Sequence, residues 1–194
     1  MTASTERSVR NDASSPVLLA AALTAAGAGA GLYVFGTNHT PDYATSLFGQ
    51  TGTDTYVLKS WLATGVLAFA VVQLSLALWM YGRLPWLGVA PPRVSPVHRA
   101  IGALAILLTI PIAYHCAFAY GVQTKFDTRV AIHSVAGCVL YGAFVAKVIL
   151  VQSPRLRAPG WALPLVGATL VVVVAVLWYT SALWYFHDFT LPSL

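Results

Sequence analysis

Long runs of apolar residues constrain the fold of this chain more than any other feature of its sequence. A bilayer core of about 30 Å requires roughly 20 apolar residues in a helix that rises about 1.5 Å per residue. Five runs meet this requirement, at residues 16–35, 57–81, 100–120, 130–150 and 162–186. A backbone in lipid must satisfy its own hydrogen bonds, and the runs lack the alternation of barrel strands. The predicted fold class is therefore all-α, an integral membrane bundle of five transmembrane helices.

The composition and the organisation of the chain agree with a membrane protein. With 58% hydrophobic and 9% charged residues in 194, the chain cannot form the polar surface of a soluble domain. We expect a disordered cytoplasmic tail at residues 1–15 and a single transmembrane domain at 16–194. A signal peptide is the alternative for the first span. The apolar run of this span is longer than that of a typical signal peptide, which has about 7–15 apolar residues, and this favours a retained membrane anchor.

The basic residues predict the orientation, because positive charge concentrates on the cytoplasmic side of a membrane. With the N-terminus in the cytoplasm, that side carries Arg7, Arg10, Arg83, Arg93, Arg99, Lys147, Arg155 and Arg157. The opposite side then carries only Lys59, Lys125 and Arg129. We predict a multi-pass protein of the plasma membrane with an extracytoplasmic C-terminus. Its expected partners are the lipid bilayer and a redox protein or larger respiratory complex. The net positive charge is explained by the membrane topology, so we expect no binding of nucleic acid.

Two histidines lie inside apolar spans and are the strongest candidates for function, because ionisable groups in a bilayer are costly. His115 and His133 both lie roughly 5–9 Å from the outer surface, on spans joined by a short loop of about nine residues. Such spans should be antiparallel neighbours whose imidazoles face each other as the axial ligands of one haem b. Gly137, one turn from His133, leaves room for the ring. The alternatives are simple hydrogen bonding, a copper or zinc ion, or proton transfer.

A second group of polar residues is predicted at the cytoplasmic side. Lys147 lies on nearly the same face of its helix as His133, about 21 Å further along, and antiparallel packing would bring it near His98. His98, Arg99 and Lys147 could therefore contact a haem propionate or a quinone head group. The alternatives are an interfacial His-Arg pair and a lysine that reaches towards the lipid headgroups.

The pattern "HRAIG…YHC…IHS" resembles membrane b-type cytochromes of the cytochrome b561 and ferric-reductase-like kind. The chain is also similar to an uncharacterised actinobacterial family of five-helix membrane proteins, over His98, Arg99, Tyr114, His115, Cys116, His133 and the closing "TSALW". The first resemblance implies electron transfer, with His115 and His133 at positions that match haem ligands. Such cytochromes often carry two histidine pairs. Lys147 stands where an inner pair would be completed, so one haem is expected rather than two.

These observations combine into one functional prediction and its alternatives. We predict a b-type cytochrome that carries electrons between a quinone pool or respiratory partner and an extracytoplasmic acceptor, as an electron-transfer subunit of a membrane oxidoreductase. The alternative is a cofactor-free structural or assembly subunit of a larger membrane complex. A proton or metal-ion transporter is less well supported, since the sequence shows no inverted repeat. Covalent haem attachment is excluded because no C-x-x-C-H motif is present.

Overall fold

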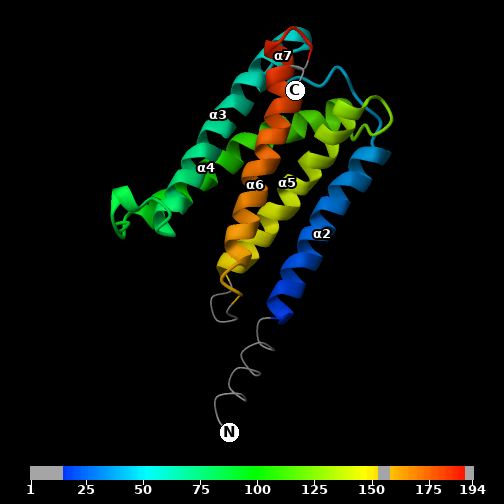
Figure 1. Ribbon diagram of the computed structural model, residues 1–194. Helices are drawn as coiled ribbons and strands as arrows, with labels where there is room; N and C mark the ends of the chain where they lie inside the picture. The colour runs from blue at the N-terminus through cyan, green and yellow to red at the C-terminus, as the bar shows by residue number, and fades with distance from the viewer. Residues whose placement is uncertain (1–14, 153–157, 191–194) are drawn as a thin grey trace.

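A computed structural model describes residues 15–152 and 158–190, and this part of the chain is all-helical (Figure 1). The helices are α2 (Ser15–Asn38), α3 (Gly52–Met80), α4 (Val94–His115), α5 (Thr128–Gln152), α6 (Ala162–Trp178) and the short α7 (Trp184–Phe186). Two π-helical turns, η2 (Cys116–Tyr120) and η4 (Tyr179–Leu183), continue α4 and α6. Five of the resulting rods are long and apolar enough to cross a membrane, so the predicted fold class is confirmed. The predicted tail lies outside the described residues, except for Ser15.

The helices do not pack in chain order. α5 lies between α2 and α6, whereas α3 packs against α4 and α6. α4 crosses obliquely behind α5 and α6 in Figure 1. The spans now seen as α4 and α5 are expected to run side by side. They contact each other through side chains, as between Thr109 Oγ1 and the Tyr141 hydroxyl, 3.0 Å apart, but their backbones come close in few places because α4 tilts towards α3.

Glycine allows α2 and α5 to approach closely. A Cβ atom on Gly142 of α5 would lie 2.7 Å from the Ala25 carbonyl oxygen of α2. A Cβ atom on Gly29 of α2 would lie 3.2 Å from the Cys138 carbonyl oxygen. Contacts this short require residues without side chains. The small residues of the first span therefore pack inside this chain.

Two helices begin earlier than predicted, which places one polar residue deeper in its helix and brings another into a helix. α3 begins at Gly52 rather than at residue 57, so Lys59 lies about two turns inside the helix. α4 begins at Val94 rather than at residue 100, and His98 is therefore helical. Pro96 does not prevent this, because the missing N–H of a proline has no helical partner in a first turn. Below, the end of the bundle where α4 finishes is called the His115 end, and the end where it begins the His98 end.

Candidate functional site

His115 is fully engaged by neighbours at its end of the bundle. Its side chain is 2% exposed, its Nε2 lies 3.0 Å from the Thr45 carbonyl oxygen, and its Nδ1 lies 3.4 Å from Lys59 Nζ. A carbonyl oxygen only accepts hydrogen bonds and an ammonium group only donates them. Nε2 therefore carries the hydrogen of a neutral imidazole, and Nδ1 accepts from Lys59. In this arrangement neither ring nitrogen has a spare lone pair.

Lys59 brings a positive charge into this cluster without a carboxylate partner among residues 15–152 and 158–190. Its Nζ lies 4.5 Å from the ring centre of Tyr120 and 5.2 Å from that of Tyr56. Cation–π contacts of this kind stabilise an ammonium group that is partly removed from water. Tyr120 also packs edge-on against His115, with ring centres 5.5 Å apart. The cluster therefore offers a cation that an anionic group could neutralise.

The connection between α2 and α3 folds over the end of α4. Within the π-helical turn η2, the Phe118 carbonyl accepts from the backbone N–H of Asp42 at 3.0 Å and lies 3.2 Å from His39 Nε2. Thr45 further along this connection supplies the carbonyl that His115 contacts. A π-helical turn frees carbonyl groups that a regular helix would use internally, and such turns are frequent at functional sites. The connection is thus fixed to α4 mainly through backbone atoms.

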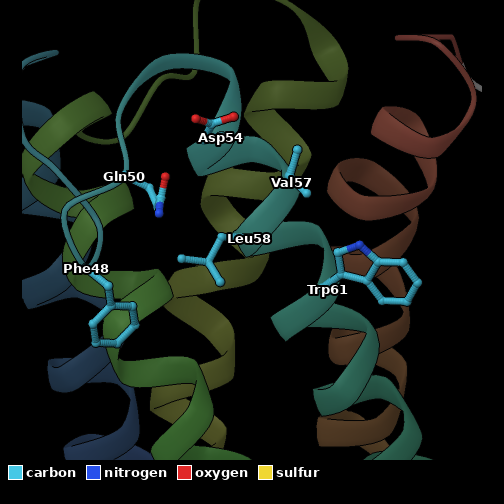
Figure 2. A pocket seen from close by; sticks show the side chains of 6 residues that line it. All are labelled: Phe48, Gln50, Asp54, Val57, Leu58 and Trp61. Carbon is cyan, nitrogen blue, oxygen red and sulfur yellow. The ribbon is translucent and has the colours of Figure 1, made fainter.

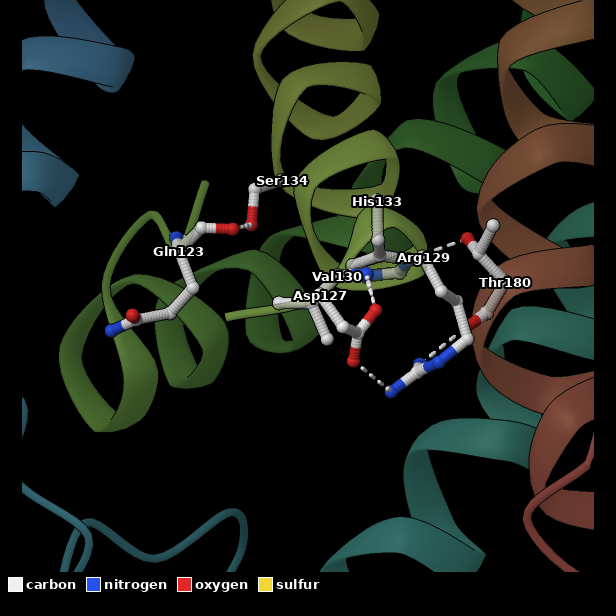
Figure 3. A network of polar contacts seen from close by, with 7 residues as sticks. All are labelled: Gln123, Asp127, Arg129, Val130, His133, Ser134 and Thr180. Atoms are coloured by element: carbon white, nitrogen blue, oxygen red, sulfur yellow. Dashed lines mark hydrogen bonds and ion pairs between the residues drawn. The ribbon is translucent and has the colours of Figure 1, made fainter. Parts of the chain in front are cut away.

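His133 belongs to a separate network that joins α5 to η4 (Figure 3). Its Nδ1 lies 2.9 Å from Thr180 Oγ1, and this hydroxyl lies 2.7 Å from the Val176 carbonyl oxygen. A hydroxyl has a single hydrogen. When Thr180 donates it to Val176, His133 Nδ1 must donate to Thr180, and the His133 Nε2 lone pair remains for another partner. A hydrogen bond of this kind orients many metal-binding histidines.

Arg129 stabilises the same network from the start of α5. Its Nη1 donates to the Thr180 carbonyl at 2.8 Å, and its Nη2 lies 3.8 Å from Asp127 Oδ2. The guanidinium carbon also lies 3.8 Å from the ring centre of Trp184. Asp127 Oδ1 accepts from the Val130 N–H at 2.8 Å at the start of the helix. The position of Thr180, and through it the His133 ring, is therefore fixed from two sides.

The two histidines are not joined to each other. No hydrogen bond or ring contact connects His115 with His133 in the described ranges. A Cβ atom on Gly137 would meet nothing within 4 Å, so the space beside it, one turn from His133, is open. His133 therefore has both a free ring nitrogen and adjoining room, whereas His115 has neither a free nitrogen nor exposure.

A third polar cluster occupies the His98 end. Gln73 Nε2 of α3 donates to the His98 carbonyl of α4 at 2.6 Å. Gln73 Oε1 and His98 Nδ1 are buried, and neither has a hydrogen-bond partner among the described residues. Lys147 of α5 is half-buried and lies near the His98 ring. Arg99 is exposed and forms no ion pair with the described part of the chain. The structure thus brings His98 and Lys147 together but leaves Arg99 apart from them.

Other features of the molecule are less suited to a cofactor. A shallow groove of about 540 Å³ at the start of α3 is lined by Phe48, Gln50, Asp54, Val57, Leu58 and Trp61 (Figure 2). It contains neither His115 nor His133. Cys116 and Cys138 are free thiols. Within residues 15–152 and 158–190, no group of three or more His, Cys, Asp or Glu side chains could hold a metal ion.

Sequence reasoning missed three residues that the structure places at these clusters. Lys59 is predicted at the outer end of its span, as one of the few outer charges, and the earlier start of α3 places it about two turns inside the helix. Gln73 lies near the middle of an apolar span, and an amide in that position is itself a signal of a special role. Thr180 carried no signal, since a hydroxyl can bond to the preceding turn of its own helix. Its partnership with His133 depends on how α5 and α6 pack.

The comparisons with known proteins give a family but no function. A family model described as "Family of unknown function (DUF6529)" matches residues 17–193. No curated protein and no solved structure gave a match.

Proposed function

We propose that this chain, which belongs to the DUF6529 family of unknown function, is a membrane electron carrier of the b-type cytochrome kind. The proposal rests on the geometry of the chain's own residues. In this proposal haem b lies between His115 and His133. The observation that carries the proposal is the state of His133, whose Nδ1 is oriented by Thr180 while its Nε2 is available beside the open space at Gly137.

Further residues at the His115 end suit the same cofactor. Haem carries two propionates, and Lys59 is a cation without a carboxylate partner in the described part of the chain. The oblique course of α4 keeps its backbone away from α5, so only side chains separate the two helices. When bound, haem b supplies a one-electron couple, and ligation by two histidines leaves iron no open position for a substrate.

His115 is less ready than His133 to bind haem iron through a ring nitrogen. Its ring already donates to Thr45 and accepts from Lys59. To act as a ligand, His115 must give up at least one of these two hydrogen bonds. The proposal therefore requires either that Lys59 withdraws from Nδ1 or that the connection between α2 and α3, which supplies Thr45, moves away from Nε2.

The direction of electron flow is part of the proposal. Positive charge on the His98 side favours a cytoplasmic location for that end, which places His115 and His133 near the extracytoplasmic surface. Electrons would then pass from a quinone pool or respiratory partner to an extracytoplasmic acceptor. The partner would be a redox protein or a larger respiratory complex.

A cofactor-free structural or assembly subunit is a second candidate function. It is favoured by one specific observation, namely that both ring nitrogens of His115 are satisfied within the chain. In this role the histidines would tie helices and loops together. Substitution of His115 would then affect stability alone.

A visible spectrum distinguishes the two candidates. The chain should be produced in haem-supplied cells, purified, and measured as reduced-minus-oxidised spectra beside His115→Ala, His133→Ala and the control His187→Ala, whose ring has no hydrogen-bond partner among the described residues. The cytochrome proposal expects a sharp α-band in the wild type and in His187→Ala, lost in the other two variants. Folded wild-type protein without a Soret band after haem reconstitution would refute it and favour the structural candidate.

A further inference from the structure

An amide with a fixed orientation leaves an unused acceptor at the His98 end. Gln73 Nε2 lies 2.6 Å from the His98 carbonyl oxygen. Since that oxygen can only accept, the nitrogen of the amide must face it, and the two atoms of the amide cannot be exchanged. Gln73 Oε1 is consequently a buried acceptor that needs a donor, and no described residue supplies one. Buried polar groups without partners are rare and costly.

Close packing holds this acceptor in place. Gly102 lies one turn after His98 on α4, and a Cβ atom on it would lie 3.3 Å from Gln73 Oε1. The glycine therefore makes room for the amide against the α4 backbone. His98 Nδ1, buried and also without a partner in the described ranges, provides a second polar atom on the same helix. The cluster is organised before any ligand arrives.

An apolar groove lies about one helical turn from these two buried atoms. It has a volume of about 660 Å³ and is lined by Leu76, Trp79, Pro91, Pro92, Arg93, Val94 and Val97. Leu76 follows Gln73 by one turn on α3, and Val94 precedes His98 by one turn on α4. Residues three or four apart share a helix face. The groove and the unpartnered atoms therefore lie on the same faces of α3 and α4, one turn apart, and a head group reaches the atoms when the side chains between them move.

We propose that this groove binds a membrane-soluble hydroquinone, with its aromatic head group at Gln73 and His98 and its apolar tail along the groove. A phenolic hydroxyl would donate to Gln73 Oε1, and its oxygen would accept from His98 Nδ1–H. The proposal identifies a donor class for the electron carrier suggested above. The binding itself does not require haem, so the two proposals can fail separately.

The polar atoms favour this head group over the other lipophilic molecules of a membrane. A carboxylate or a phosphodiester only accepts hydrogen bonds and leaves Gln73 Oε1 unsatisfied. An ammonium head group would donate, but Lys147 lies near the His98 ring and repels a second cation. A neutral hydroxyl on an apolar body both donates and accepts without adding charge.

The test compares a decyl hydroquinone with its dimethyl ether, which keeps the ring and the tail but has no O–H group. Binding of the radiolabelled compounds to full-length protein in lipid nanodiscs is measured under reducing conditions, and binding to empty nanodiscs is subtracted. The wild type should bind the hydroquinone about tenfold more tightly than the ether, because the ether leaves Gln73 Oε1 unpaired. Gln73→Met should weaken hydroquinone binding about tenfold and barely change ether binding.

Matched variants make the result decisive. Ser75→Ala on the same helix removes a hydroxyl that bonds only to the Val71 carbonyl and should bind both compounds like the wild type. If Gln73→Met does not fold, Gly102→Ala keeps every polar group but displaces the amide, and it should weaken hydroquinone binding about threefold. Equal affinities for the two compounds in the wild type would overturn the proposal. So would the absence of saturable binding, which would assign the unpartnered atoms to water or lipid.

Discussion

The hydrogen bond between Lys59 and His115 gives a quantitative test of the geometry at the His115 end. Their Nζ and Nδ1 atoms lie 3.4 Å apart, near the long limit for such a bond. A hydrogen bond to a charged group contributes about 1.5–3 kcal/mol. The long distance and the half-exposed lysine place this bond below that range, and Lys59 also keeps its contact with Tyr120. We therefore expect a coupling energy of about 1 kcal/mol between the two side chains.

A double-mutant cycle measures this coupling. The wild type, Lys59→Met, His115→Leu and the double variant are unfolded reversibly in mixed micelles with increasing denaturing detergent, and unfolding is followed by circular dichroism. His115→Leu alone should lower the free energy of unfolding by about 2–3 kcal/mol, since it also leaves the Thr45 carbonyl without a donor. The double variant should be less destabilised than the sum of the two single variants by about 1 kcal/mol.

A second cycle serves as the control. Lys59→Met combined with Ser75→Ala pairs two positions about 24 Å apart on α3. Their effects on the free energy of unfolding should add within about 0.5 kcal/mol. If Lys59 and His115 also add within that margin, the hydrogen bond and the imidazole tautomer inferred from it are wrong.

Three further tests use four substitutions, one of which is a control. Thr180→Val keeps the shape of the side chain but removes the partner of His133 Nδ1, and it should lower the free energy of unfolding by about 1 kcal/mol in the same detergent titration; no change would mean that the bond does not form. Gly142→Ala should cost about 1–3 kcal/mol, because its Cβ would lie 2.7 Å from a backbone oxygen of α2. Gly167→Ala, whose Cβ meets nothing within 4 Å, should be neutral, and equal effects of the two substitutions would refute the close approach. Gly137→Leu fills open space, so it should leave the fold stable while reducing the α-band of the reduced protein; an unchanged band would place the cofactor elsewhere.

The transmembrane architecture could be read from the sequence because span length and hydropathy are local properties. The residues at which the helices begin were harder to predict from the sequence. Gly52 and Val94 begin helices inside segments rich in Gly, Pro and Thr, where local propensity favours loops and the tertiary structure decides. The difference has consequences, since it places Lys59 deeper in its helix than predicted and makes His98 part of a helix.

The arrangement of the spans was the hardest part to predict. A short connection between two helices fixes only the distance between their adjoining ends, and α4 tilts towards α3, so that beyond the connection α4 and α5 meet through side chains such as Thr109 and Tyr141. The preference of α5 for α2 depends on backbone contacts at Gly29 and Gly142, which sequence spacing alone cannot pair. His115 and His133 lie within helices that are long and apolar enough to cross a membrane, as predicted, and His115 is buried whereas His133 is half-buried. Their partners come from distant segments and could not be foreseen.

The pairing of α2 with α5 also has a bearing on biosynthesis. Membrane helices leave the ribosome in chain order, and α2 is the first span among the described residues whereas its main partner is the fourth. The glycine-rich surface of α2 must therefore face lipid, or the translocation machinery, until most of the protein has been made. Chains that stop before Thr128 would never cover that surface, which gives a quality-control system a physical mark by which to recognise unfinished copies.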